Sequence, residues 1–485
     1  MDGKALADHA VEYGRSVGAD YIEARFIDSV NENYFARNGK FLGIQKTPNR
    51  GLGIRVLKGG GMGFGSLDQL EKDEVEDRVE SITKMAELSG RREGIKLSEE
   101  DTVQESWSVS VKRPFEDISQ EEKQEYVEKL DEEIEKSGTG TLPFRSKIKN
   151  RIIFLHMHTL DKYIVTSDGS KVNSDESFIS LYLVMNAKTK NRREQRMLGK
   201  GSSSGWEWLE EENVRDFIAQ EGEKLVRSAQ RAEEMDLSQP IDVVVGPEVS
   251  GIMAHENVGH PSESDRIMGR EAAQAGESFY EDILGEKGLE EKKKIGSDAV
   301  TVIDDPTMEG SPGYYEYDEE CVEAEPRYLI KDGYLNDLLL NREYASVFNS
   351  DSNGAARAAS YSREPIPRMS NTYFDPGEYG KEELIEDIDK GILMNSFTEW
   401  NIDDRRFHSK YVGLEAYLIE NGEITDTMVK RPTLEITTPR LLKSVDAVSK
   451  NYERRMNFCG KSDPQQPVPV STGGPYLKLK DMRVG

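Results

Sequence analysis

Two histidines and one glutamate stand within the segment His255-Glu256-Asn257-Val258-Gly259-His260, in a chain that has only six histidines. Imidazole nitrogen is a preferred ligand of zinc, and a carboxylate beside the first ligand can take a proton from water at the metal. The segment therefore predicts a hydrolytic metal site in which His255 and His260 are ligands and Glu256 is the general base. The alternative is a helix that carries two ordinary surface histidines.

The spacing of these histidines differs from that of the common zinc-peptidase helix, in which the two ligands are four positions apart. Residues five apart on an ideal α-helix differ in direction by about 140°, against about 40° for residues four apart. Joint ligation by His255 and His260 therefore requires a wide turn such as a π-bulge, which is frequent at functional sites. We expect Gly259 to make this distortion inexpensive through its backbone freedom.

A catalytic zinc site needs a third protein ligand and an open position. Cys459, Cys321, His408 and any carboxylate are candidates. Acidic neighbours disfavour a Cys321 thiolate, which predicts a buried structural thiol, whereas Lys461 would favour a thiolate at Cys459. On chemistry alone Cys459 leads, and a small buried hydrophobic residue is the open alternative. His408 would be a surface residue.

A second pair of histidines, His156 and His158, lies on one face of an expected strand. A metal pair is conceivable there, but no third ligand is apparent nearby. We therefore interpret this pair as part of an ordinary half-buried strand.

Composition limits the classes of function. The net charge of −27 disfavours binding to nucleic acid or to an anionic membrane surface. Two cysteines exclude a disulfide framework and fit a reducing compartment. The N-terminal residues do not resemble a signal peptide, and no stretch approaches the length of a membrane span. We expect a cytoplasmic protein.

The elements that would position the motif follow a linker at Asp236–Pro240. Ile241–Val245 reads as an apolar strand, and Pro247 opens the helix that ends in the motif. Hairpin signals then recur at Asp332-Gly333 and Asn421-Gly422. We predict an α+β fold with a mixed N-terminal domain over residues 1–235, which the pattern allows to divide into lobes 1–110 and 111–235. A mostly antiparallel-β C-terminal domain over residues 241–485 carries the metal-binding helix.

Three segments carry a resemblance to a known family: HENVGH, SREPIPRMSNTYFDPG and FCGKSDPQQPVPVSTGGPYLKLKDMRVG. Together they resemble the TldD/PmbA metallopeptidases, in particular the TldD-like branch, over nearly the whole chain. The resemblance implies one Zn²⁺ per chain, held by His255, His260 and Cys459, with Glu256 catalytic. The PmbA-like branch lacks the motif, so this chain is similar to the catalytic type of subunit.

The same resemblance implies extended or unfolded peptide substrates and a dimer, either a homodimer or a heterodimer with a motif-less PmbA-like subunit. We expect Arg357 and Arg368 to line the enclosed chamber and pair with a peptide carboxylate. The alternative is that they are solvated surface arginines or structural arginines. The run after the second histidine departs from the family's Gly-Leu-Glu-Gly-Asp but keeps two carboxylates, Glu263 and Asp265. We expect one of them to orient His260.

Two rival functions remain. A non-catalytic peptide-binding subunit would hold a structural metal or none, but it would have no use for Glu256. A cysteine peptidase that uses Cys459 would need a partner histidine and asparagine, and the sequence supplies no convincing set of these. The activity of such an enzyme would persist in the presence of chelators.

Overall fold

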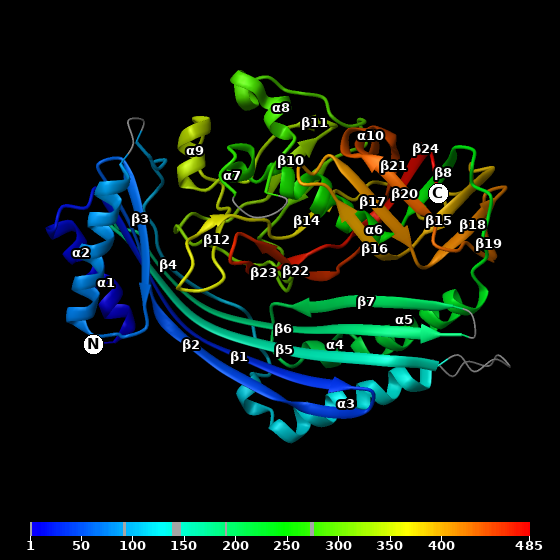
Figure 1. The fold of residues 1–485 in the computed structure, drawn as a ribbon, viewed down its shortest axis with the longest axis horizontal. Coiled ribbons are helices and arrows are strands. Elements are labelled where there is room, and N and C mark those ends of the chain that lie inside the picture. The colour runs from blue at the N-terminus through cyan, green and yellow to red at the C-terminus, as the bar shows by residue number, and fades with distance from the viewer. Residues whose placement is uncertain (1, 91–93, 138–146, 190–191, 272–275) are drawn as a thin grey trace.

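The computed structural model describes residues 2–90, 94–137, 147–189, 192–271 and 276–485. In it, strands from the first half of the chain form a long curved sheet (Figure 1). Its strands are β1 (Tyr21–Arg37), β2 (Lys40–Lys58), β3 (Gly61–Leu67), β4 (Gln104–Ser108), β5 (Lys147–Thr166), β6 (Lys171–Lys188) and β7 (Arg193–Ser202). The strand order is β3-β2-β1-β5-β6-β4, with β7 also paired to β6. Neighbours are antiparallel except β4 and β6, which are parallel.

Helices cover one face of this sheet. They are α1 (Gly3–Ser16), α2 (Lys72–Ser89), η1 (Phe115–Asp117), α3 (Gln120–Ser137), α4 (Trp208–Glu211) and α5 (Val214–Arg231). On β5, Leu155 and Met157 are buried in a cluster with Leu130 of α3 and Leu225 of α5. Because side chains alternate along a strand, His156 points to the opposite face, toward the C-terminal half of the chain.

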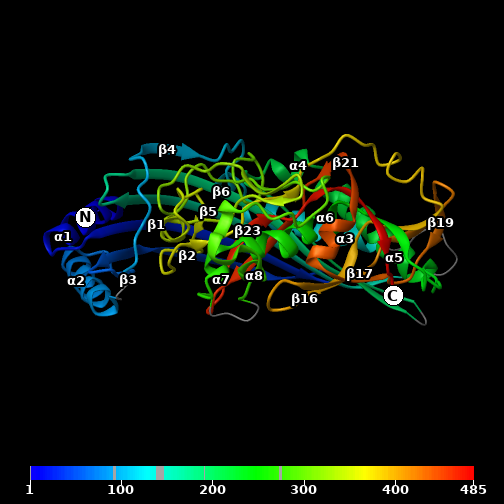
Figure 2. The same cartoon turned by 90° about the horizontal axis from the view of Figure 1, so that it is seen from above.

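The C-terminal half contains a mostly antiparallel sheet of order β19-β18-β15-β8-β24-β21, in which β8 runs parallel to β15. Its strands are β8 (Ile241–Val245), β15 (Lys390–Met394), β18 (Ala416–Glu420), β19 (Glu423–Met428), β21 (Val445–Glu453) and β24 (Gly474–Met482). The two views show this half lying over the long sheet, with α1 and α2 at one end of the molecule and β19 at the other (Figures 1 and 2).

Smaller sheets surround this one in the orders β11-β10-β9-β14, β16-β17-β20, β22-β23 and β12-β13. Their strands are β9 (Val302–Asp304), β10 (Arg327–Lys331), β11 (Tyr334–Leu335), β12 (Ala356–Arg357), β13 (Ile366–Pro367), β14 (Thr372–Phe374), β16 (Phe397–Ile402), β17 (His408–Gly413), β20 (Thr433–Thr437), β22 (Met456–Lys461) and β23 (Gln466–Ser471). The helices here are α6 (Pro247–Ala254), η2 (His255–Gly259), η3 (His260–Ser262), α7 (Ser264–Ile267), α8 (Tyr280–Leu284), η4 (Gly285–Glu290), α9 (Arg342–Phe348) and α10 (Thr438–Ser444).

The motif helix is set into the largest hydrophobic core. Strand β8 is central in its sheet, and α6 begins directly after it with Pro247 in the first turn. All eight residues of α6 are buried. A methyl group on Gly251 would lie 1.7 Å from the carbonyl oxygen of Thr472, so glycine permits the close approach of α6 to the chain before β24. This packing fixes the position of the C-terminal end of α6, where the His255–His260 motif begins.

The expected α+β fold is confirmed. The hairpin turns at Asp332-Gly333 and Asn421-Gly422 are also confirmed, with positive φ at all four residues. Both expected N-terminal lobes contribute strands to one sheet, because β4 of the first pairs with β6 of the second. The division of the chain into domains at residues 235–241 stays a prediction.

Candidate metal centre and active site

The two motif histidines converge because the helix widens where they stand. Residues His255–Gly259 form a π-helical turn between α6 and the short 3₁₀ turn of η3. The rings of His255 and His260 lie with centroids 4.8 Å apart at an interplanar angle of 79°. The wide turn predicted from the five-residue spacing is confirmed.

Gly259 serves this turn for a reason other than the expected one. Its φ and ψ are both −59°, in the ordinary right-handed region that any residue adopts, so the expectation of special backbone freedom was wrong. A methyl group at this position would instead lie 2.0 Å from Sδ of the buried Met369. Glycine therefore leaves room for the side chain of Met369, which occupies the space beside the turn.

Cys459 of β22 completes the cluster. One ligand atom from each of His255, His260 and Cys459 lies within 4.8 Å of the others, and all three residues are buried. The Sγ of Cys459 is 3.6 Å from Nε2 of His260. Burial would raise the pKa of the Cys459 thiol, but the two imidazoles and the Arg368 guanidinium bring it well below its usual value. The thiolate, which is the form that binds metal, is therefore favoured.

The donor set fits a zinc ion. Ligand atoms of a tetrahedral zinc centre lie about 3.3–3.8 Å apart, given metal–ligand bonds of about 2.0–2.3 Å. The 3.6 Å separation of Cys459 and His260 falls in this range, and the three donor atoms all lie within 4.8 Å of one another. The buried Nδ1 of His255 has no hydrogen-bond partner among the residues that the structure describes.

Glu263 holds the second histidine. Nδ1 of His260 lies 2.9 Å from Oε2 of Glu263, an arrangement typical of metal-binding histidines. Burial would raise the pKa of Glu263, but the charges of Lys461, Arg266 and His260 lower it well below its usual range. Asp265 instead accepts a hydrogen bond from Lys461 Nζ at 2.6 Å. Of the two expected carboxylates, Glu263 is the one that contacts His260.

Arg368 and Arg357 both contact the β22–β23 hairpin that carries Cys459. The guanidinium of Arg368 is fully buried and donates to the carbonyl oxygens of Cys459 and, at 2.7 Å, Gln466. Arg357 donates to the carbonyl oxygen of Pro469 at 3.1 Å. The expected pairing with a peptide carboxylate stays a prediction for both, and the burial of Arg368 gives it no support.

Glu256 lies beside the cluster and is held by two side chains that the sequence did not single out. Nη1 of Arg406 donates to Oε2 of Glu256 at 2.6 Å, and the indole N–H of Trp400 donates to Oε1 at 3.3 Å. Burial would raise the pKa of Glu256, but Arg406 and the two histidines lower it. The basic character of residues 405–410 was the only sequence signal for Arg406, and it did not indicate a partner.

The remaining candidates lie outside the cluster. His408 is exposed at the start of β17, and Cys321 is buried with the pKa of its thiol raised by burial, as expected of a structural thiol. His156 and His158 line a cavity of about 980 Å³ between the long sheet and the β22–β23 hairpin. The ring of Phe458, which neighbours Cys459 but points away from it, lies 5.8 Å from the ring of His156.

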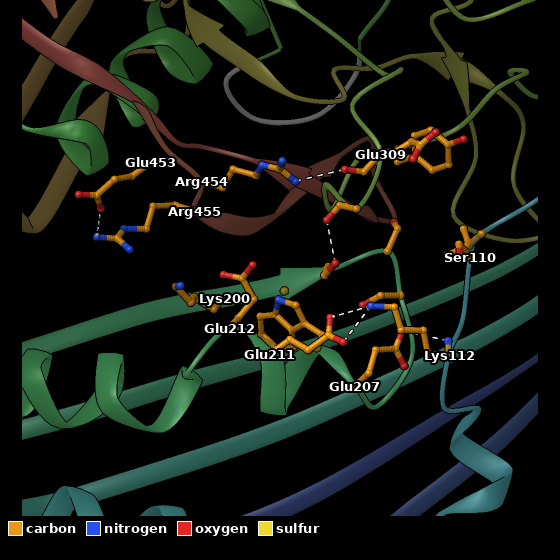
Figure 3. Close-up of a pocket in the computed structure, with 18 of the residues that line it drawn as sticks. Ser110, Lys112, Lys200, Glu207, Glu211, Glu212, Glu309, Glu453, Arg454 and Arg455 are labelled. Carbon is orange, nitrogen blue, oxygen red and sulfur yellow. Dashed lines mark hydrogen bonds and ion pairs between the residues drawn. The ribbon is translucent and has the colours of Figure 1, made fainter. Parts of the chain in front are cut away.

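A second cavity, of about 870 Å³, lies between β7 and the segment that joins β21 to β22 (Figure 3). Lys112 pairs with Glu211 there, and Arg454 donates to the carbonyl oxygen of Glu309. No residue of the His255, His260 and Cys459 cluster lines this cavity or the first one. None of the helices in the described ranges is both long and apolar enough to cross a membrane.

Comparison with known proteins shows which family the chain resembles along its length. Models of the PmbA/TldA metallopeptidase family match residues 22–87 (domain 1), 113–233 (central domain) and 238–485 (C-terminal domain). The chain is 30% identical to a metalloprotease of Methanothermobacter thermautotrophicus over 467 residues, which cover 96% of this chain and 95% of that protein. It is 23% identical to a zinc metalloprotease TldD homolog of Saccharolobus solfataricus, with 98% of each chain covered.

A solved structure has the same fold. The crystal structure of TldE from Thermococcus kodakarensis superimposes with a TM-score of 0.74 at 15% identity and covers 99% of this chain and 100% of that one. At 15% identity this match shows a common fold and no more. The family models and the 30% identical relative match the sequence itself along most of the chain. This chain therefore belongs to the PmbA/TldD family of metallopeptidases.

Proposed function

We propose that this chain is a zinc-dependent peptidase that binds one Zn²⁺ through His255, His260 and Cys459 and hydrolyses extended peptides with Glu256 as general base. The observation that carries the proposal is the convergence of three ligand atoms from segments 199 positions apart, beside a buried carboxylate. The name of the Saccharolobus solfataricus relative includes zinc, which supports the choice of metal.

The division of labour follows from the positions of the side chains. When bound, zinc supplies Lewis-acid polarisation of a carbonyl and of water. Glu256 then accepts the proton of the attacking water and returns it to the departing amine. A thiolate ligand donates more charge than imidazole and so acidifies water less, which increases the reliance on Glu256. Glu263 holds the imidazole of His260 in the orientation that the cluster needs.

An extended substrate is supported by the strand beside Glu256. Strand β16 is the end strand of the sheet β16-β17-β20 and bears Trp400, which contacts Glu256. An end strand offers backbone donors and acceptors to an added strand, and such binding depends little on the peptide's side chains. The proposed substrates are therefore unfolded or extended peptides.

We further propose a cytoplasmic dimer, either a homodimer or a heterodimer with a motif-less PmbA-like subunit. The TldE fold of the Thermococcus kodakarensis structure supports a paralogous partner of the same shape. The two free, buried cysteines fit a reducing compartment. Light scattering of the purified chain, alone and mixed with such a paralogue, distinguishes the two assemblies.

The rival is a non-catalytic peptide-binding subunit with a structural metal or none. The Arg406–Glu256 ion pair favours it, because a carboxylate paired with a guanidinium is a weaker base. Metal analysis coupled to cleavage of an unstructured peptide separates the readings. We expect about one zinc per chain and cleavage that stops with a chelator and returns with zinc. Zinc without cleavage, alone or with the paralogue, would support the rival, and cleavage that survives chelation would indicate a cysteine peptidase.

A further inference from the structure

The β16–β17 hairpin holds both oxygens of the Glu256 carboxylate. Trp400 on β16 contacts Oε1, and Arg406 in the turn between the strands contacts Oε2. Arg406 is only 8% exposed, and Glu256 is 7% exposed. A charge-assisted hydrogen bond of 2.6 Å between two buried groups fixes the position of the carboxylate more firmly than a neutral contact would.

The same hairpin is also bonded to the residue next to Glu256. The side-chain amide of Asn257 donates to Ser409 Oγ at 3.2 Å and to Thr438 Oγ1 at 2.7 Å, and the Tyr411 hydroxyl donates to its Oδ1. Ser409 and Tyr411 belong to β17. Consecutive residues of the π-turn are therefore tied to one hairpin, and the carboxylate cannot shift without disturbing this buried network.

The backbone of Arg406 is fixed as well. It adopts a left-handed conformation with φ of 62°, which is uncommon for a residue other than glycine. Its N–H donates to the carbonyl oxygen of Asp403 at 3.1 Å, and its own carbonyl oxygen accepts from Thr438 Oγ1 at 2.8 Å. A strained backbone that is held on both sides is frequent where a side chain must be aimed.

We infer that Arg406 is a positioning residue for peptide hydrolysis, which aims the Glu256 carboxylate at the metal cluster with the help of Trp400. The inference rests on the function proposed for Glu256. On this inference the Arg406–Glu256 ion pair is intact in the active enzyme. The alternative is an inhibitory pair that must separate before Glu256 can act as a base. Without Arg406 only the Trp400 contact, which is 3.3 Å long in the intact site, would hold the carboxylate, so the carboxylate would move. A misplacement of about 1 Å in a catalytic group lowers the rate on the order of 100-fold.

Arg406→Gln and Arg406→Lys test this inference in the full chain, with Arg405→Gln as the matched control. Arg405 is the neighbouring arginine, but its side chain is 43% exposed and pairs with Asp282 on the surface. We expect Arg406→Gln to keep its zinc and its KM while kcat falls about 100-fold. Arg406→Lys should recover part of the loss, because lysine restores the charge without the planar fork. Arg405→Gln should behave as the unmodified protein.

A second readout is independent of turnover. The chain has four tryptophans, so the ¹⁵N indole signals are few, and Trp400→Phe assigns the one beside Glu256. In metal-free protein, Arg406→Gln should shift the Trp400 indole signal because the carboxylate that accepts it moves, whereas Arg405→Gln should not. If Arg406→Gln fails to fold, Arg406→Lys carries both measurements, with a smaller shift and a smaller loss of kcat expected.

The outcomes separate this inference from the proposed function. If the unmodified protein cleaves peptide and Arg406→Gln cleaves as fast or faster, Arg406 either has no part in catalysis or inhibits it, and the inference is overturned. If the unmodified protein does not cleave peptide at all, the proposed function fails. In that case the Trp400 indole signal still decides whether Arg406 positions the carboxylate, and an unshifted signal overturns that as well.

Discussion

Gly259→Ala inserts one methyl group into the π-helical turn that carries the proposed metal ligands, and its effect can be worked out from the structure. The added carbon would lie 2.0 Å from Sδ of Met369 and must move about 1.4 Å to reach the 3.4 Å of an ordinary contact. Met369 is fully buried, so the turn and its histidines have to share the movement. Overpacking of a core by a methyl group costs about 1–3 kcal/mol of unfolding free energy.

Two effects of this substitution oppose each other. Alanine is favoured over glycine at helical φ and ψ by about 1 kcal/mol. The overpacking term is at least as large, so we expect a net loss of up to about 2 kcal/mol and weaker zinc binding, since His260 is the next residue. Met369→Ala alone removes a buried side chain, which costs about 2–5 kcal/mol. The double variant should be more stable than the sum of the single effects implies, by about 1–3 kcal/mol, because it relieves the collision.

Denaturant unfolding and zinc competition with a chelator measure this double-mutant cycle. The expected result is coupling between Gly259 and Met369 in both unfolding free energy and zinc affinity. If Gly259→Ala is neutral or stabilising and the two substitutions are additive, the space-filling explanation of this glycine is refuted. The backbone conformation of the turn would then need another account.

Three further predictions concern the carboxylates and the cavity. Glu256→Gln should keep zinc and lower kcat by about 10²–10⁴-fold, checked by metal analysis and peptide cleavage; undiminished cleavage contradicts its role. Glu263→Gln removes the charged acceptor of His260 and should weaken zinc binding about 10–100-fold in a chelator competition; unchanged affinity would remove Glu263 from the site. Burial lowers the pKa of His156 and His158 to about 4 from 6.5, so the unfolded state binds more protons between these values and stability should rise with pH there; unfolding midpoints that stay flat from pH 4 to 6.5 would contradict this.

Local features of the fold could be predicted because they depend on neighbouring residues. The Asp332-Gly333 and Asn421-Gly422 turns need only two residues that accept positive φ, and both form as expected. The π-helical turn follows from the spacing of His255 and His260 in the same way, since a normal helix would separate them.

Contacts between distant segments could not be predicted from such patterns. For Cys459, a small buried hydrophobic residue was an open alternative until the family resemblance was considered. Its position depends on how β22 approaches His260, 199 positions earlier in the chain. Trp400 and Arg406 reach Glu256 from about 150 positions away, which no local periodicity indicates. The reason for Gly259 was missed because Met369, the residue that fills the space, lies on another segment of the chain.

X-ray absorption at the zinc edge of the purified protein tests the central claim most directly. The account predicts two nitrogen ligands at about 2.0–2.1 Å and one sulfur ligand at about 2.3 Å, with the sulfur lost in Cys459→Ser. A spectrum without a sulfur ligand, or one that Cys459→Ser leaves unchanged, would contradict it.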